Sequence, residues 1–501
     1  MAENSFAKKK KKNFRQKNKC ETVSLFSSIS GCAQNGNVKE VVRILKSDPT
    51  RLHARNVQGQ MPLHVAVSKG HRDVVEAIIN QKADLNAVDS QGNTALHLAV
   101  MAESPDMVRL LLKKGASFTI KNQAQMMPVH LAAELPTTEI MKILLEHGAD
   151  PNARGEGGVT ALHLAAGQDN GDMMRLIMST GGKPCMKCDY GYYPIHVAAK
   201  SASANAMSAI IEQALKCGYT REQILNFKDR ENNLPLHSAV YGGNIKAVSV
   251  CLNAGALVNA QQEDGSTPLH FACSQGNMDM IKLMKEAQPD HFLAAVQSVD
   301  SMKMTPLHRA ALFNHKPVME YLLNENADID ARDIHERTPL LLAASKGCWD
   351  TVQMLVQRGA DIRVKDKNSR NFLHLAIKFG GKLKSIGGSF MKDIQHLLNE
   401  RDDFGCTPLH YASKEGHLFA LDDLIKMGAV LNLKDNHKQS PFHFAARYGR
   451  VNTCRRLLDS IHGPNIINET DGDGLTALHI AAQNGHTKII QLLLERGAVV
   501  S

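Results

Sequence analysis

The sequence of 501 residues predicts an all-α solenoid made of short helix-turn-helix units that stack on one another. Three observations predict this fold. A motif close to Thr-Pro-Leu-His-x-Ala recurs along the chain, most copies are 33 residues apart, and many copies precede a second apolar segment that ends at glycine. A fixed period of this length is typical of repeat proteins, whose single units cannot bury their apolar faces alone.

The recurring motif is defined by its histidine. It occurs at His64, His97, His130, His163, His196, His237, His270, His308, His374, His410, His443 and His479. The gaps between these histidines, in order, are 33, 33, 33, 33, 41, 33, 38, 66, 36, 33 and 36 residues. The gap of 66 covers two units, because Leu341 occupies the histidine position in one of them. A Thr-Pro-Leu-His-x-Ala core with this period resembles ankyrin repeats, in which each unit is a turn and two short helices.

The first helix of a unit is expected to begin after a threonine, as at Thr94. The Thr94 side-chain oxygen can accept from a backbone N–H two or three residues later, which the helix end otherwise leaves unpaired. Most other units have proline at the first helical position, as in Thr267-Pro268, where its fixed φ suits a helix. Small residues follow and predict a thin helix that neighbouring units approach closely: Ala95, Ala99 and Ala102.

The second helix carries apolar residues at the i, i+3, i+4 spacing of one buried face. In the unit from Gln91 to Gly115 these residues are Met107, Val108, Leu111 and Leu112. Glycine is expected to end this helix in a left-handed conformation. The glycines in this position are Gly115, Gly148, Gly255, Gly359, Gly428 and Gly497. Asparagine or aspartate then begins the turn into the next unit, as at Asp150 and Asn152.

Thirteen units follow this pattern, and a degenerate first unit lies around Ser24 to Arg55. The prediction is therefore about fourteen repeats over residues 23–501, joined by turn or hairpin loops, after a disordered basic tail at 1–22. Repeat arrays usually end in a polar capping unit, and the last unit, which ends at Ser501, lacks one. We therefore expect the repeat domain to be truncated at its C-terminus.

Three steps are longer than 33 residues, and insertions in repeat proteins are usually loops. Longer loops are therefore expected near 215–230, 287–304 and 380–390. The last of these is rich in glycine and lysine, which could suggest a phosphate-binding loop. It lacks the order Gly-x-x-x-x-Gly-Lys-Ser/Thr, so a flexible insertion is the preferred interpretation.

The net charge of +9 is concentrated at the N-terminus. Residues 1–20 hold eight Lys or Arg and one Glu, so the remainder of the chain carries only +2. A near-neutral solenoid argues against nucleic-acid binding. The lysine-rich tail could contact anionic lipid or serve as a nuclear address, but blocks of like charge are usually solvated and unfolded.

The sequence also favours a cytosolic location. No stretch reaches the 18 or so consecutive apolar residues of a membrane helix, and no secretory signal follows the lysine block. Ten cysteines without framework spacing indicate a reducing compartment. No nucleophile, base and cleft motif is present, so an enzyme is not predicted, and neither is a cofactor.

The repeated histidines are predicted to be structural. Packed helices lie about 8–10 Å apart, whereas zinc holds each nitrogen ligand at about 2.0–2.1 Å. Neighbouring motif histidines therefore cannot share a metal ion. Instead, each imidazole is expected to form hydrogen bonds within or between the repeat turns, because buried polar groups need partners.

Cysteine positions give one candidate site. Cys185 and Cys188 form a single C-x-x-C, with Cys217 further on, which is a weak zinc motif and more simply two exposed thiols in a turn. Four cysteines within expected helices are interpreted as small buried apolar residues: Cys251, Cys273, Cys348 and Cys454. Cys406 precedes a Thr-Pro pair at the start of a helix. Since a helix N-terminus lowers a thiol pKa, Cys406 is a candidate reactive thiol.

One segment begins like a calcium-binding loop, Asp471-Gly472-Asp473-Gly474. Such loops need a third oxygen ligand at their fifth position and a glutamate at their twelfth. Leu475 and Ala482 occupy these positions, so an ordinary turn is predicted. No metal site is predicted anywhere in the chain.

Several stretches are more specific than the repeat requires. They are Gly181–Cys185 with Gly191–His196, Gly218–Arg221 with Asn226-Phe227, Gly405–Ala412 and Ser440–Cys454. These stretches and the irregular steps resemble the N-terminal repeats of the ankyrin-type transient receptor potential (TRPA) cation channels, from about Gly31 to the last residue. The resemblance implies the cytosolic sensory arm of a homotetrameric, non-selective, calcium-permeable channel of the plasma membrane, with no pore in this chain.

In that family electrophiles react with cysteines, mostly in a linker beyond these repeats. One cysteine implicated within the family's repeats matches Cys406, but its companion seven residues later is Ser413 in this chain. The alternative function is a soluble adaptor in the cytoplasm that binds partner proteins on its concave surface. A nuclear scaffold that uses the lysine-rich tail is a third hypothesis, weakened by the lack of positive charge beyond residue 20.

Overall fold

The computed structural model describes residues 29–378, 394–460 and 462–500. Within this part of the chain the regular structure is helical, and the only extended pairing is an isolated bridge between Thr470 and Thr476. The all-α class predicted from the repeat is confirmed. The basic tail and the loop expected near 380–390 lie outside the described residues.

The chain divides into two compact units, Met1–Ala256 and Leu257–Ser501, each built from helix pairs. In the first unit, the first helices of the repeats are α3 (Pro62–Ser68), α5 (Ala95–Met101), α7 (Pro128–Ala133), α9 (Ala161–Gly167), α11 (Pro194–Lys200) and α14 (Pro235–Tyr241). The second helices are α2 (Val38–Ser47), α4 (Arg72–Asn80), α6 (Pro105–Lys113), α8 (Glu139–Glu146), α10 (Gly171–Ser179), α12 (Ala204–Lys216) and α15 (Ile245–Asn253). Short helices η1 (Pro49–His53), η2 (Glu156–Gly158) and α13 (Arg221–Leu225) lie between them.

In the second unit, the first helices are α16 (Pro268–Gln275), α19 (Pro306–Leu312), α21 (Pro339–Ser345), α23 (Phe372–Lys378), α25 (Pro408–Glu415), α27 (Pro441–Arg447) and α30 (Ala477–Gln483). The second helices are α17 (Met278–Ala287), α20 (Lys316–Asn324), α22 (Trp349–Gln357), α26 (Leu418–Lys426), α28 (Val451–Leu458) and α31 (Thr487–Glu495). The additional helices are α18 (Pro289–Gln297), η4 (Gln395–Leu397) and α29 (Gly463–Ile466).

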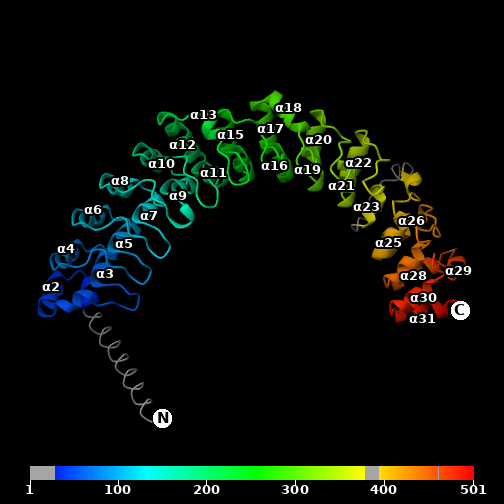
Figure 1. The fold of residues 1–501 in the computed structure, drawn as a ribbon, viewed down its shortest axis with the longest axis horizontal. Coiled ribbons are helices and arrows are strands. Elements are labelled where there is room, and N and C mark those ends of the chain that lie inside the picture. Colours follow the sequence, from blue (N-terminus) through cyan, green and yellow to red (C-terminus); the bar gives the residue numbers. More distant parts are fainter. Residues whose placement is uncertain (1–28, 379–393, 461, 501) are drawn as a thin grey trace, which may run out of the picture. The chain divides into compact units, whose positions relative to one another are not determined.

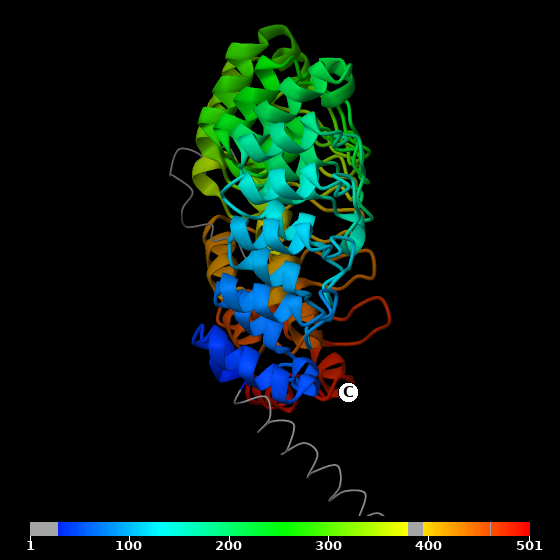
Figure 2. The same ribbon diagram turned by 90° about the vertical axis from the view of Figure 1, so that its left-hand side faces the viewer.

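Within each unit the first helices form one row and the second helices another (Figure 1). A first helix packs against the first helices of its neighbours and against its own partner, as α5 does with α3, α7 and α6. For the first unit, Figure 2 shows the turns between repeats projecting to one side of the helix rows. Contacts of this kind join neighbouring repeats, as in other solenoids.

The unit around α5 and α6 shows why these residues form helices. Thr94 is the N-cap of α5, and its side-chain oxygen accepts from the His97 N–H. Ala95 and Ala99 are fully buried, which lets neighbouring first helices approach, while Ala102 is exposed and forms the C-cap after this helix. Gly115 has a φ of 91° and ends the α6 segment in the left-handed region, where a side chain would be strained.

The apolar face of α6 forms part of the core. Met107, Val108, Leu111 and Leu112 are all buried, as the spacing predicted. Burying a side chain of this size stabilises the fold by about 1.5–3 kcal/mol relative to its exposure. Because α6 meets α8 across the repeat boundary, as well as α5, one unit depends on its neighbours for its core.

Aspartates in the turns hold the hairpin-like loops in shape. The Asp89 carboxylate accepts from the backbone N–H groups of Gln91 and Asn93, at 2.8 and 2.9 Å. Successive turns are also joined through their backbones, since the Ser90 N–H donates to the Gln58 carbonyl at 3.0 Å. The backbone polar groups of these loops thus find partners without a β-sheet.

The loop expected near 215–230 contains a helix instead. Thr220 caps α13 by accepting from the Gln223 N–H at 3.1 Å, and the Gln223 side chain accepts from the Thr220 N–H at 2.9 Å. This reciprocal pair is a capping box, and its Thr-x-x-Gln pattern is visible in the sequence. Ile224 and Leu225 are buried and attach the helix to α12.

The loop expected near 287–304 also differs from the expectation, because half of it is helix α18. Pro289 stands at the first turn of α18, where proline is favoured. Phe292, Ala295 and Val296 then follow at i, i+3, i+4 spacing and are buried. An insertion with its own apolar face packs against α17 and α19 rather than remaining a loop.

The packing of α18 gives a direct test. We expect Phe292→Ala to lower the free energy of unfolding by about 3–5 kcal/mol, because Phe292 is fully buried. Leu293→Ala, at the adjacent but 44% exposed position, is the matched control and should cost less than about 1 kcal/mol. Urea unfolding followed by fluorescence of Trp349, the single tryptophan, measures both. Equal small effects would mean that the segment is not packed.

Candidate functional site

The motif histidines form hydrogen bonds that join each repeat to the next. In α5, His97 Nδ1 accepts from the Thr94 N–H at 3.1 Å, and Nε2 donates to the Met126 carbonyl of the next repeat at 3.0 Å. Accepting at one nitrogen and donating at the other defines a neutral imidazole. Both ring nitrogens are therefore used within the fold.

The same inter-repeat contact recurs along the chain. The Nε2 atom faces the following carbonyls: His64 that of Ala87, His130 that of Ala153, His163 that of Tyr192, His196 that of Asn233, His270 that of Met304, His308 that of Arg337, His374 that of Cys406, His410 that of Gln439 and His443 that of Glu469. His237 and His479 accept at Nδ1 from the N–H groups of Leu234 and Thr476. This is the arrangement expected of structural histidines.

Two positions depart from the pattern. Leu341 replaces the histidine in α21 and is fully buried, while Thr338 still caps that helix through the Leu341 N–H. The N-cap before His196 is Tyr193, which makes no side-chain capping bond, and the His196 Nδ1 has no hydrogen-bond partner among the described residues. A repeat can therefore stand without the imidazole, provided that the position remains buried.

Burial controls the protonation of these histidines. Desolvation lowers the pKa of His64, His97, His130, His196, His308 and His443 below the usual value. It lowers the pKa of His163, His270, His374 and His410 to about 4. The carbonyls that accept from Nε2 oppose the shift but do not outweigh it. The repeat array thus holds a series of neutral imidazoles.

Cys406 lies at the start of α25, as predicted, but it is buried and only 7% exposed. Its N–H donates to the Asp402 carboxylate at 2.8 Å, and its carbonyl accepts from His374. Burial, and next the negative charge of Asp402, raise the pKa of Cys406 to about 12. This direction is opposite to the one expected from the helix N-terminus. Reactivity at Cys406 stays a prediction, and these surroundings disfavour it.

The other cysteines fall into two groups. Cys251, Cys273 and Cys454 are buried within helices, and desolvation raises the pKa of each thiol. Cys348 instead stands at the N-cap of α22 and is only partly buried, so the expectation of a helical core residue is corrected there.

The Cys185–Cys188 pair is not two exposed thiols. Cys185 is exposed, whereas Cys188 is buried in the turn, where its N–H donates to the Tyr192 carbonyl. The Tyr219 hydroxyl lies 3.1 Å from the Cys185 sulfur. Across the described ranges, no group of three or more His, Cys, Asp or Glu residues is placed to hold a metal ion.

The segment at Asp471 has the geometry of a turn. The Asp471 carboxylate accepts from the N–H groups of Asp473 and Leu475, both at 3.0 Å, as the other turn aspartates do. Its second oxygen accepts from the Gln439 side chain at 2.9 Å. These bonds occupy the carboxylate within the fold.

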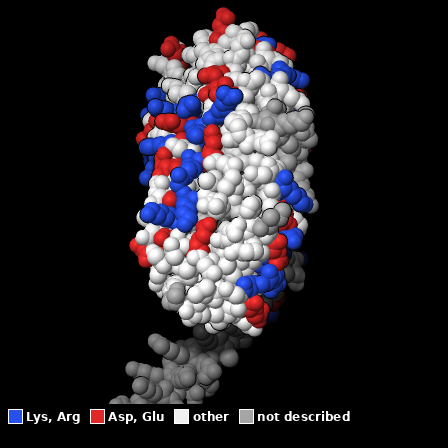
Figure 3. Space-filling view, turned by 90° about the vertical axis from the view of Figure 1, so that its right-hand side faces the viewer, with Lys and Arg blue, Asp and Glu red and all other residues white. Residues whose placement is uncertain are grey.

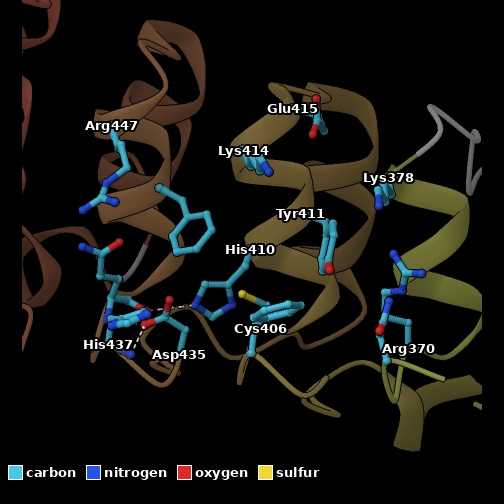
Figure 4. Close-up of a pocket in the computed structure, with 14 residues that line it drawn as sticks. Arg370, Lys378, Cys406, His410, Tyr411, Lys414, Glu415, Asp435, His437 and Arg447 are labelled. Atoms are coloured by element: carbon cyan, nitrogen blue, oxygen red, sulfur yellow. Dashed lines mark hydrogen bonds between the residues drawn. The ribbon is translucent and has the colours of Figure 1, made fainter. Parts of the chain in front are cut away.

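A hollow of about 400 Å³ lies over α23, α25 and α27 of the second unit, and we call it the α25 hollow. Figure 4 shows Lys378, Lys414 and Arg447 along one side of it, with Tyr411 and His410 beneath them. Cys406 lies at its base. The sequence motifs did not point to this feature, although the repeat alignment contains its signal: all three cations stand four positions after a motif histidine.

Buried ion pairs and hydrogen bonds support the walls of the α25 hollow. Arg370 donates to the Asp366 carboxylate through Nε at 2.9 Å and through a terminal nitrogen at 2.6 Å. The Tyr411 hydroxyl donates to Asp402 at 2.7 Å. These contacts fix the aromatic ring and the guanidinium, so the hollow is formed by the fold itself.

Comparison with known proteins agrees with the fold. A family model described as ankyrin repeats (3 copies) matches residues 29–122, 115–188, 236–333, 340–435, 382–470 and 420–501. Together these segments cover most of the chain. No helix among the described residues is long and apolar enough to cross a bilayer.

Three curated relatives are informative. The transient receptor potential cation channel subfamily A member 1 of Drosophila melanogaster is 44% identical over 304 residues, 60% of this chain and 25% of the relative. The protein of the same name from Homo sapiens is 38% identical over 299 residues, 59% of this chain and 27% of the relative. Ankyrin repeat protein nuc-2 of Neurospora crassa is 30% identical over 262 residues, 52% of this chain and 20% of the relative.

The matched part of this chain spans about a quarter of the length of the two channel relatives. The predicted resemblance to the repeat region of TRPA channels is confirmed.

The histidine network predicts a loss of stability in acid. Histidine titrates near pH 6.5 in the unfolded chain and near 4 at His163, His270, His374 and His410, so protons bind preferentially to the unfolded state between these values. The free energy of unfolding should be highest above about pH 6.5 and should fall as the pH is lowered toward 4. Each such site should cost about 2 kcal/mol at pH 5. Urea unfolding at several pH values, followed by Trp349 fluorescence, measures this for the second unit.

The control for this test is His410→Leu, which copies the natural leucine at position 341. It should reduce stability at pH 7, because it leaves the Gln439 carbonyl without its imidazole donor. It should also flatten the pH dependence by about 1.4 kcal/mol per pH unit. An unchanged dependence of stability on pH would contradict the expectation that His410 takes up a proton when the chain unfolds.

Cysteine accessibility can be checked separately. At pH 8, iodoacetamide should label Cys406 as slowly as Cys454, and more than about tenfold more slowly than Cys185, because burial denies the first two a thiolate and access. Peptide mass spectrometry over a time course reports each site. Labelling of Cys406 ahead of Cys185 would restore the reactive-thiol hypothesis.

Proposed function

The chain belongs to the ankyrin-repeat family, and we propose that it is the cytosolic ankyrin-repeat arm of a TRPA-like, non-selective, calcium-permeable cation channel. The identity of 44% over 304 residues to the Drosophila melanogaster channel carries the proposal. A similarity over this length extends well beyond the short motif that all ankyrin repeats share. It supports a common role as well as a common fold.

In this proposal the chain lies at the cytoplasmic face of the plasma membrane, and its partners are other subunits of a homotetrameric channel. The repeats act as a sensory and assembly region, and ions pass through a pore supplied by other sequence. The solenoid suits this role, because contacts between neighbouring repeats allow a displacement at one place to be passed along the array. The basic tail could contribute contacts with anionic lipid.

The second candidate function is an adaptor that binds other proteins without a pore. The α25 hollow favours it, because polar and aromatic side chains from neighbouring repeats converge there. The 30% identity to ankyrin repeat protein nuc-2, which is not named as a channel, is compatible with it. The two functions differ in whether these repeats can support ion conduction when they are joined to a channel pore.

A chimera distinguishes them. The segment of the Drosophila melanogaster channel that aligns with this chain is replaced by the corresponding residues of this chain. A control chimera carries the aligned nuc-2 repeats instead. We expect the first chimera to reach the cell surface and to conduct cations when stimulated, because its repeats fit the rest of the channel. Whole-cell currents and surface biotinylation measure the two properties.

The outcome against the channel function is equally clear. A first chimera that reaches the surface as well as the natural channel but passes no current, like the nuc-2 control, would favour the adaptor.

A further inference from the structure

Three consecutive described first helices of the second unit end with a cation in the same position. Lys378, Lys414 and Arg447 each stand four residues after a motif histidine, on α23, α25 and α27. The equivalent residues on the flanking helices α21 and α30 are Ser345 and Gln483. We call Lys378, Lys414 and Arg447 the cationic row. It lies along one side of the α25 hollow (Figure 4).

Basic side chains outnumber acidic ones around the α25 hollow. The α25 hollow is lined by four Lys or Arg and by two carboxylates, those of Glu415 and Asp435. The Asp435 carboxylate already accepts from the N–H groups of His437 and Gln439 in its own turn. Arg370, the fourth cation, is paired with Asp366. An excess of positive charge therefore faces the hollow.

Two cations of the row, Lys414 and Arg447, form no ion pair with a carboxylate within the described ranges. The Lys414 ammonium lies over the Tyr448 ring, 5.2 Å from its centroid, and Arg447 is exposed. Burial, followed by repulsion from the charges of Arg370 and Lys414, lowers the pKa of Lys378, although the charges of Asp366 and Glu415 oppose the shift. A bound anion would relieve that repulsion.

Apolar surface lies beside these charges. Phe404 is 63% exposed at the tip of a turn, and Tyr411 and Phe444 are half-buried on α25 and α27. The ring of Phe444 packs edge-on against His410, with centroids 5.2 Å apart. Rigid aromatic rings next to cations are typical of sites that bind peptides and proteins. By contrast, acidic and basic side chains alternate in a band on the face drawn in Figure 3.

The distances between the three cations of the row determine the length of ligand that can contact all of them. Packed helices lie about 8–10 Å apart, so the three cations are distributed over about 16–20 Å. A peptide in the extended polyproline II conformation has three residues per turn and rises about 3.1 Å per residue, so every third side chain lies on the same face, about 9 Å from the last, and meets the next helix. A single phosphate group is too small to reach all three positions.

We propose that the cationic row and the aromatic rings beneath it bind an extended acidic peptide segment that carries a carboxylate at every third residue. The carboxylates pair with Lys378, Lys414 and Arg447, and an apolar side chain between them packs on Tyr411 and Phe444. The segment belongs to a partner protein, whose negative charge complements the excess of basic side chains around the hollow. This site does not depend on the channel function, since it requires only the described repeats.

The test uses a fluorescein-labelled peptide with the repeating sequence Asp-Leu-Ser and fluorescence anisotropy with the whole chain at low salt. A variant with Lys378→Gln, Lys414→Gln and Arg447→Gln should bind about tenfold more weakly or worse, because three partly exposed ion pairs are lost. Added salt should weaken binding to the natural chain more than to the variant. Circular dichroism melting confirms that the variant is folded.

A matched control exists in the first unit. Lys200 also stands four residues after a motif histidine, His196, and lies over aromatic rings, those of Tyr192 and Tyr241, but it does not line the α25 hollow. Lys200→Gln should leave peptide binding unchanged. Charge exchange supplies an independent check: Lys414→Glu should abolish binding of the acidic peptide, and binding should return when the central Asp of the peptide is replaced by Lys.

Other results would overturn the proposal. These are undiminished binding by the triple variant, an equal loss in Lys200→Gln, or equal affinity for a peptide of the same composition with its carboxylates contiguous. The binding experiment is repeated with inositol hexakisphosphate and with phosphatidylserine vesicles as alternative ligands. If either binds through the row while the peptide does not, the site is one for small polyanions or for a membrane, and the peptide assignment is wrong.

Discussion

The structure depends on one constraint: a single repeat cannot bury its own apolar face or satisfy its own turn. The motif histidine provides the hydrogen bonds that the turn needs. Its Nδ1 accepts within the repeat and its Nε2 donates to a carbonyl of the following repeat, as His97 does with Met126. Because both groups are buried, losing either partner would leave a costly unpaired polar atom. The apolar residues of the second helices supply most of the burial, and the histidines fix how the repeats are placed.

The same constraint explains the irregular repeats. The longer steps add helices, α13 and α18, whose apolar side chains pack on neighbouring helices in place of exposed loops. The replacement of histidine by Leu341 shows that burial at this position is required, whereas the hydrogen bond is required only in most repeats. Sequence variation is therefore tolerated where it keeps water out of the contact surface between neighbouring repeats.

Function resides where side chains are not needed for stacking. Positions that face a neighbouring repeat are occupied by alanine, leucine and histidine, but the fourth position after the histidine is free to vary. On α23, α25 and α27 it carries Lys378, Lys414 and Arg447, which face the α25 hollow. Cys406 illustrates the opposite case, since the stacking of repeats buries its thiol beside Asp402. A TRPA-like arm would thus carry its binding chemistry on the variable positions of an otherwise uniform array.

The sequence alone determined the all-α class, the stacked repeat, the glycine helix ends and the core faces. Each of these follows from local spacing, because the period of 33 and the i, i+3, i+4 pattern act within one unit and its neighbours. The sequence also contains the Thr-x-x-Gln pattern of the α13 capping box, although the length of the 41-residue step by itself predicts a loop. Only the tertiary structure decided the pKa of Cys406, the burial of Cys188 and the convergence of the cationic row. These properties depend on which side chains of different repeats come together, and a pattern within one repeat does not contain that information.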